Sequence, residues 1–213
     1  MRDALVGLGA LLLSPLWMLA QLDRSDHVFA ACSELLSLVP GRLGVFVRRS
    51  FYRMTLHACA SDVHVGFGTT LAHSQVRIGR GVYIGNRCTL GMCDIGDHAT
   101  LGSNVDLLSG RRQHRFDDPS MPVQHQGGDF TMVGIGTNSW IGNSAVIMAN
   151  IGANAVVGAG SVVVHAVPSG AVVAGNPAQV KRIRSTSCHS ERSEESPEIL
   201  RCAQNDKSAR ETA

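Results

Sequence analysis

The sequence contains little of what several function classes require. Of its 213 residues, 5% are aromatic and 17% are charged, and the formal net charge at pH 7 is +2. A chain with so small a positive excess lacks the basic field typical of nucleic-acid-binding proteins, so we expect no nucleic-acid partner. Its six cysteines include no CxxC pair. This pattern argues against a disulfide-dense scaffold and predicts reduced thiols in a cytoplasmic protein.

A long uncharged run lies close to the N-terminus. Residues 4–22 comprise 19 residues without a charged side chain, close to the roughly 20 residues that a helix needs to cross a bilayer. Pro15 removes a helix hydrogen bond near the middle of the run, which favours a kinked or shallow helix. Two interpretations stay open: residues 4–22 span or contact the cytoplasmic membrane at its inner face, or they pack against the main domain or a neighbouring subunit.

Arginines gather in the segment that follows. Arg42, Arg48, Arg49 and Arg53 lie in the amphipathic stretch GRLGVFVRRSFYRMTL. A basic bias after an apolar run holds the next domain on the cytoplasmic side. The same stretch suits the surface of an anionic membrane, or it packs, like residues 4–22, against the main domain or a neighbouring subunit. We therefore predict an apolar and amphipathic helical segment over residues 1–57.

A repeat of six residues takes over from about residue 63 and determines the fold. Aliphatic side chains recur in groups of three, spaced by six, and glycine follows most of them. The aliphatic residues are Ile78, Ile84, Leu90, Ile95, Leu101, Leu107, Ile135, Ile141, Ile147, Ile151, Val157 and Val163. A period of six fits neither a helix nor a pair of long alternating strands, but it fits short strands joined by tight turns.

Three such hexads close one triangular turn of a parallel β-helix, so we predict an all-β domain over residues 58–184. The aliphatic side chains point inward, and the glycine-rich corners adopt backbone angles that other residues resist. Cys88 lies four residues after an aliphatic residue, where small side chains recur, so it is expected to fill a core position. Residues 185–213 abandon the repeat and lack apolar content, which predicts a disordered tail.

One charged segment interrupts the repeat. The stretch VDLLSGRRQHRFDDPSMPVQHQGGDF carries two histidines, His114 and His125, and we predict a loop over residues 109–132. A histidine in a loop is commonly a plain surface residue. An imidazole is also the side chain whose pKa lies near neutral pH, which makes it the usual general base for a hydroxyl.

The C-terminal half of the repeat resembles the hexapeptide-repeat acyltransferases, which include maltose, galactoside and colanic-acid O-acetyltransferases. The resemblance rests on W-I-G, V-V-G-A-G-S-V-V and V-x-A-G-N-P-A, and covers about residues 60–184. It implies a left-handed parallel β-helix, acetyl-CoA as acyl donor, no metal, and a homotrimer with active sites between adjacent prisms. It also implies that a loop histidine acts as general base.

The position matching that base is His114, with His125 as the rival in the same loop. Arg111 and Arg112 flank the base together with Arg115. They orient an acidic or phosphate-bearing acceptor, or they only solubilise the loop. Asp117 and Asp118 either pair with these arginines or hold His114 in its tautomer; the sequence leaves both alternatives open.

On the coenzyme side the resemblance assigns Trp140 to the lining of the cleft. Asn143 and Ala159 match positions that meet the pantetheine arm, largely through backbone groups, and Lys181 and Arg182 match basic residues near the coenzyme phosphates. Simpler explanations stay open: Trp140 only packs at a corner of the coil, and Lys181 and Arg182 only form a solvated basic end.

The acceptor side matches less well. The sugar-contacting asparagine of the galactoside enzymes has no clear counterpart, and Asn86 and Arg87 lie nearest to its position. The usual T-K-D-V-P is replaced by V-H-A-V-P at residues 164–168, so a threonine hydroxyl and a lysine often found near the coenzyme are absent.

The resulting hypothesis is an acetyl-CoA-dependent O-acetyltransferase that acts on a sugar hydroxyl in polysaccharide or glycolipid synthesis. A sugar-amine N-acetyltransferase is the alternative within the same class. A zinc enzyme of the γ-type carbonic anhydrase kind is disfavoured because it needs two histidines close in sequence. A non-catalytic β-helix scaffold is the remaining alternative, and it would need no histidine loop.

Overall fold

A computed structural model of the chain describes residues 14–15, 17–18 and 26–184. Most of the predicted apolar segment 4–22 and the whole predicted tail 185–213 lie outside the described residues. Within the described part, no helix is both long and apolar enough to cross a bilayer.

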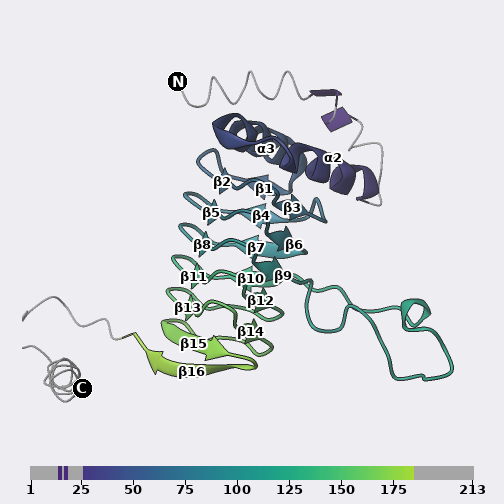
Figure 1. The fold of residues 1–213 in the computed structure, drawn as a ribbon, viewed down its shortest axis with the longest axis vertical. Coiled ribbons are helices and arrows are strands. Elements are labelled where there is room, and N and C mark those ends of the chain that lie inside the picture. Colours follow the sequence, from purple (N-terminus) through teal and green to yellow (C-terminus); the bar gives the residue numbers. More distant parts are fainter. Residues whose placement is uncertain (1–13, 16, 19–25, 185–213) are drawn as a thin grey trace, which may run out of the picture.

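The described chain is two helices followed by a stack of short strands (Figure 1). The helices are α2 (His27–Ser37) and α3 (Gly41–Thr55). The strands are β1 (Ala58–Cys59), β2 (His64–Val65), β3 (Thr70–Leu71), β4 (Arg77–Ile78), β5 (Tyr83–Ile84), β6 (Thr89–Leu90), β7 (Cys93–Ile95), β8 (Thr100–Leu101), β9 (Asp106–Leu107), β10 (Val133–Ile135), β11 (Trp140–Ile141), β12 (Val146–Ile147), β13 (Val156–Val157), β14 (Val162–Val163), β15 (Ala171–Gly175) and β16 (Ala178–Ile183).

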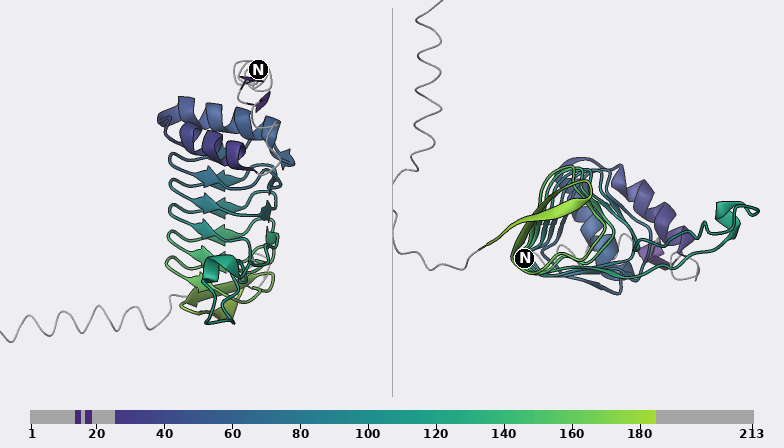
Figure 2. Two further views of the ribbon diagram at one scale, coloured as in Figure 1. Left: turned by 90° about the vertical axis from the view of Figure 1, so that its right-hand side faces the viewer. Right: turned by 90° about the horizontal axis from the view of Figure 1, so that it is seen from below.

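Three sheets form the sides of a triangular prism. Sheet A contains β1, β4, β7 and β10, sheet B runs from β2 to β15 and ends in β16, and sheet C contains β3, β6, β9, β12 and β14. All strand pairs are parallel except β15 with β16. The view along the prism shows successive coils superimposed (Figure 2). The predicted parallel β-helix is confirmed.

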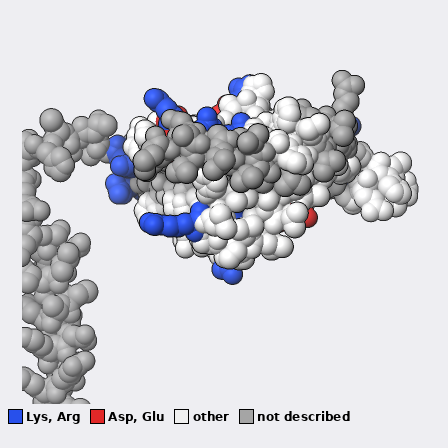
Figure 3. Space-filling view, turned by 90° about the horizontal axis from the view of Figure 1, so that it is seen from above, with Lys and Arg blue, Asp and Glu red and all other residues white. Residues whose placement is uncertain are grey.

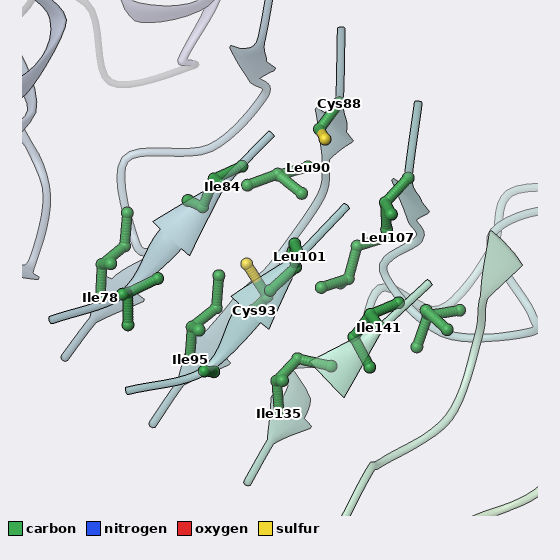
Figure 4. Close-up of a cluster of buried hydrophobic side chains, with 14 of the residues drawn as sticks. Ile78, Ile84, Cys88, Leu90, Cys93, Ile95, Leu101, Leu107, Ile135 and Ile141 are labelled. Atoms are coloured by element: carbon green, nitrogen blue, oxygen red, sulfur yellow. The ribbon is translucent and has the colours of Figure 1, made fainter. Parts of the chain in front are cut away.

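The hexad side chains fill the interior of this prism (Figure 4). In the register of sheet B, Leu101 pairs with Ile84 on one side and with Ile141 on the other, and all three are completely buried. Cys88 is buried as predicted, and burial raises the pKa of its thiol. The six-residue period therefore arises because each side of the triangle in each coil contributes one inward-facing aliphatic side chain.

Leu101→Ala is expected to lower the free energy of unfolding by about 3 kcal/mol, because the truncation leaves a cavity between two stacked coils. Urea unfolding measures this loss. Leu38→Ala, at an exposed position, is the control and should change stability by about 0.5 kcal/mol or less. A Leu101→Ala protein as stable as wild type would contradict the assigned interior position.

The glycines that follow the aliphatic residues have a different role from the one predicted. Gly85 and Gly142 do not adopt positive φ; the left-handed positions at the corners include non-glycine residues such as Arg87 and Ser144. A Cβ on Gly142 would lie 2.5 Å from the backbone nitrogen of Ala159 in the next coil. Glycine is needed here because stacked coils approach closely.

Helices α2 and α3 cover the N-terminal end of the prism (Figure 1). An aromatic cluster joins them: the ring centroids of Phe29 and Phe51 lie 5.9 Å apart, and those of Phe51 and Tyr52 lie 5.8 Å apart. The Tyr52 hydroxyl is 2.8 Å from that of Ser33, and burial raises the pKa of Tyr52 to about 12. The apolar interior of the β-helix is thereby closed to solvent at its N-terminal end.

Arg48 lies beneath this helical cap and is completely buried. Its guanidinium donates hydrogen bonds to the carbonyls of Leu36 (3.1 Å) and Val39 (2.8 Å), and its Nε donates to the carbonyl of Val65 (3.1 Å). Burial lowers its pKa. Of the two interpretations of this segment, Arg48 follows the one in which it packs against the main domain and not the one in which it faces a membrane: it ties the end of α2 to the first coil.

Candidate active site

A single loop leaves the prism between β9 and β10, after the third coil, and projects away from it (Figures 1 and 2). Its two arms are hydrogen-bonded to each other. The amide of Arg115 donates to the carbonyl of Gly127 (2.9 Å), and the amide of Asp129 donates to the carbonyl of Arg112 (2.7 Å). His114 therefore stands on a paired, hydrogen-bonded ribbon.

Asp118 takes neither of the two roles predicted for it, and the acid that pairs with Arg115 is a different one. Arg115 forms an ion pair with Asp129 at 3.2 Å. Asp118 instead accepts hydrogen bonds from the amide and the hydroxyl of Ser120, which lowers the pKa of its carboxyl group. Sequence reasoning missed Asp129, because its partner lies fourteen positions away and the contact exists only after the loop folds back.

The imidazole of His114 is exposed and borders a cavity of about 650 Å³. The cavity is lined by Arg111, Arg112, His114, Arg115, Phe116, Asp117 and Asp129. Several guanidinium groups beside one imidazole suit an acceptor that carries negative charge or many hydroxyl oxygens. His125 is also exposed and ends a short 3-10 helix, Val123–His125, in the outer part of the loop.

Three residues predicted on the coenzyme side, Trp140, Lys181 and Arg182, lie on strands of sheet B. Trp140 on β11 pairs with Val156 on β13, Val156 pairs with Val172 on β15, and Val172 pairs with Arg182 on β16. Neighbouring strands lie about 4.8 Å apart, so this column extends over about 14 Å. Trp140 is 56% exposed at one end, and Lys181 and Arg182 supply exposed positive charge at the other. We call this column the sheet B face.

Within one chain the sheet B face and the loop are separated. Figures 1 and 2 show the sheet B strands on one side of the prism and the loop leaving on the other. The structure thus brings the predicted coenzyme residues together but does not bring Trp140 next to His114. A site that uses both requires a second copy of the chain.

The fold is similar to that of two solved acetyltransferases. A maltose O-acetyltransferase from Clostridium difficile 630 has a TM-score of 0.66 and 23% identity, covering 75% of this chain and 87% of that chain. The chain has the hexapeptide-repeat acetyltransferase fold. A hexapeptide-repeat acetyltransferase from Vibrio cholerae, complexed with acetyl coenzyme A, has a TM-score of 0.63 and 21% identity, covering 73% of this chain and 85% of that chain. No family model and no curated protein matches the sequence.

In this acetyltransferase fold the corner between sheets B and C carries a ladder of polar contacts. The Asn143 side chain accepts a hydrogen bond from the amide of Ser103 (3.0 Å), and the backbone carbonyl of Asn143 accepts one from Gly160 (2.8 Å), next to Ala159. Asn143 and Ala159 thus lie on consecutive coils at one corner. Because the Asn143 carboxamide oxygen is engaged with the preceding coil, a ligand would meet the Asn143 side-chain nitrogen, the backbone groups of this corner and Ala159.

The same corner holds Asn86 and Arg87, the residues that sequence matching placed nearest to a sugar contact. The Asn86 side chain accepts a hydrogen bond from the amide of Phe67 (2.9 Å), and Arg87 Nε donates to the side chain of Asn104 (3.1 Å). Both side chains already bond neighbouring coils. They lie before sheet C, whereas the His114 loop leaves after it, so this chain does not bring them together with His114.

A second cavity lies between sheet C and the start of the loop, where Gln113, the residue before His114, lines it. It measures about 420 Å³. Its lining is Ala72, His73, Thr89, Gly91, Asp106, Leu107, Leu108, Ser109, Gln113, Phe130 and Val146. Sequence reasoning missed these residues, because Phe130 reaches the edge of the His73 ring (centroids 6.0 Å apart) only through folding of the loop. The mainly apolar lining suits a ligand with an apolar face.

Among the described residues, no group of three or more His, Cys, Asp or Glu side chains is arranged to hold a metal ion.

Proposed function

We propose that this protein is an acetyl-CoA-dependent O-acetyltransferase that acetylates a sugar hydroxyl, in polysaccharide or glycolipid synthesis on the cytoplasmic side of the membrane. The observation that carries the proposal is the loop. In a coil of otherwise regular hexads, the long interruption presents an exposed histidine on a hydrogen-bonded ribbon, beside a cavity lined by arginines.

His114 removes the proton of the acceptor hydroxyl as the oxygen attacks the thioester carbonyl. A sugar hydroxyl is a poor nucleophile at neutral pH, and a positioned imidazole accelerates such a step by about 10²–10⁴-fold. The bond that forms joins the acceptor oxygen to the acetyl carbon, and the bond that breaks is the carbon–sulfur bond. The proton held by His114 then passes to the departing thiolate, so the reaction is a direct transfer.

The sheet B face supplies the coenzyme site in this proposal. Acetyl-CoA supplies the activated acyl group when bound. Lys181 and Arg182 bind its phosphates, the backbone at Asn143 and Ala159 meets the pantetheine arm, and Trp140 packs beside it. Backbone amides at this corner stabilise the negative charge that develops on the carbonyl oxygen.

The distance between the loop and the sheet B face within one chain supports a homotrimer. In a closed ring each loop reaches the sheet B face of the next copy, which gives three equivalent sites. The acceptor then lies over the cavity beneath Phe130, with Arg111 and Arg112 near its polar or charged groups. An apolar wall of this kind suits the face of a sugar ring.

Transfer of a labelled acetyl group tests the proposal. The chain is incubated with labelled acetyl-CoA and a panel of sugars, nucleotide-sugars, lipid-linked glycans and amino sugars, and the labelled product is then treated with mild base. Loss of the label supports an ester and therefore O-acetylation, whereas retention shows an amide and replaces the proposal by N-acetylation. A chain that binds no coenzyme A and labels no acceptor would be a scaffold.

Substitutions on the sheet B face are expected to weaken coenzyme binding more than catalysis. Trp140→Ala and Arg182→Gln should each raise KM for acetyl-CoA about 5–10-fold and change kcat less, since the lost contacts are to a part of the coenzyme remote from the reacting bond. Steady-state kinetics with varied acetyl-CoA measures this. Tyr83→Ala removes another exposed aromatic side chain of sheet B, nearer the N-terminal end, and should leave this KM unchanged.

A further inference from the structure

Several large apolar side chains are exposed to solvent at the helical cap and in the turn beside it. Leu35, Leu38 and Leu43 are 59%, 65% and 65% exposed, and Phe67 is 41% exposed. The amide of Gly68, next to Phe67, donates a hydrogen bond to the carbonyl of the last residue of α2 (2.9 Å), which fixes this turn beside the end of the helix. Leu35, Leu38, Leu43 and Phe67 together are called the apolar tip.

The apolar tip is not required by the fold. The inward face of α2 already packs on the first coil through Phe29, Cys32 and Leu36, all of which are buried. Exposed apolar groups that gather in one place mark a surface that meets another apolar phase. They lie at the turn that joins α2 to α3, where side chains from both helices point outward.

The exposed charged side chains of α2 and α3 are two arginines and one glutamate. Arg42 stands beside Leu43 and is exposed, and Arg53 is exposed further along α3. The exposed acidic side chain on α2 is Glu34. Figure 3, which looks down on this end of the molecule, shows basic side chains at several places and acidic ones at few among the described residues. This pattern is complementary to anionic lipid headgroups.

Two further features direct the same end of the molecule toward a lipid surface. The uncharged residues 4–22 precede α2 in the chain. The cap also closes one end of the prism, so the three tips of a trimer with parallel prisms would face one plane and bind it with avidity. The second argument rests on the homotrimer of the proposed function, whereas the first does not.

We propose that the apolar tip docks on the surface of an anionic lipid bilayer. The leucines and Phe67 enter the boundary between headgroups and acyl chains, and Arg42 pairs with lipid phosphates. The loop lies three coils from the cap, so a docked enzyme would hold its acceptor site close to the membrane. A lipid-linked or membrane-bound glycan is the class of acceptor that this arrangement favours.

Vesicle sedimentation with the full chain tests the docking. Wild type is compared with Leu35→Ser/Leu38→Ser/Leu43→Ser and with Arg42→Gln, on vesicles of phosphatidylcholine alone and of phosphatidylcholine mixed with phosphatidylglycerol. Ile183→Ser, which removes an exposed apolar side chain at the other end of the prism (58% exposed), is the matched control. Thermal unfolding verifies that each variant is folded.

We expect wild type to bind the mixed vesicles, the triple variant to bind at least about tenfold more weakly, and Arg42→Gln to bind about fivefold more weakly with a smaller salt dependence. Ile183→Ser should bind like wild type. Equal binding of wild type and the triple variant would overturn the proposal, as would equal binding to neutral vesicles, tip-dependent self-association without lipid binding, or no binding to either vesicle. The readout is independent of acetyl transfer, so a failure here is distinct from a failure of the enzyme assignment.

Discussion

Replacing His114 by alanine is expected to lower kcat/KM for acetyl transfer by about 10²–10⁴-fold, because the acceptor hydroxyl loses its general base. The KM for acetyl-CoA should change little, since His114 lies on the loop and the coenzyme residues lie on sheet B. The measurement is steady-state thiol release with an acceptor identified by the labelling experiment.

The loop offers a matched control in His125. His125→Ala removes an exposed imidazole eleven positions further along the same loop, and its activity should stay within about twofold of wild type because no step of the mechanism uses it. His114→Asn adds a second test, since asparagine keeps hydrogen-bonding groups but cannot accept a proton at neutral pH. If His125→Ala loses the activity and His114→Ala keeps it, the roles of the two histidines are reversed.

The second large effect concerns stability and Arg48. Arg48→Met is expected to lower the free energy of unfolding by about 4 kcal/mol, because it removes the guanidinium that donates to three backbone carbonyls beneath the cap. Two of them, at Leu36 and Val39, lie at or just beyond the C-terminal turn of α2. The last carbonyls of a helix lack a full set of intrahelical donors. A cation placed beside them also interacts favourably with the negative end of the helix dipole.

Urea unfolding measures this loss, with Arg42→Met as the control. Arg42 is exposed on the same helix, so its replacement should change stability by about 0.5 kcal/mol or less. Methionine keeps much of the length of the arginine stem, which limits the cavity that the change creates. An Arg48→Met protein as stable as wild type would show that the cap is held by its aromatic cluster alone.

The coil could be predicted from sequence because one physical requirement repeats. Each side of each turn needs one inward aliphatic side chain, and Leu101 and Ile141, forty residues apart, still pair in the same register. The loop could be predicted for the converse reason, since charged residues cannot continue a buried ladder. The role of His114 as general base followed from the resemblance, not from the periodicity.

Contacts between segments distant in sequence could not be predicted. An arginine is usually a surface residue, and Arg48 can be buried only because carbonyls from the end of α2 and from the first coil accept its hydrogen bonds. The pairing of Arg115 with Asp129 depends on how the loop returns. Glycine is needed at position 142 because the neighbouring coil leaves no room for a Cβ. The sequence-based explanation, a corner with unusual backbone angles, was therefore wrong for this residue.

We propose that this chain transfers an acetyl group from acetyl-CoA with His114 as base. The decisive measurement is thiol release from acetyl-CoA, with and without acceptor, for wild type and His114→Ala. We expect release by wild type that depends on the acceptor, and a loss of at least about a hundredfold in the variant. Equal rates for the two proteins, or no release with any acceptor together with no binding of coenzyme A, would contradict it.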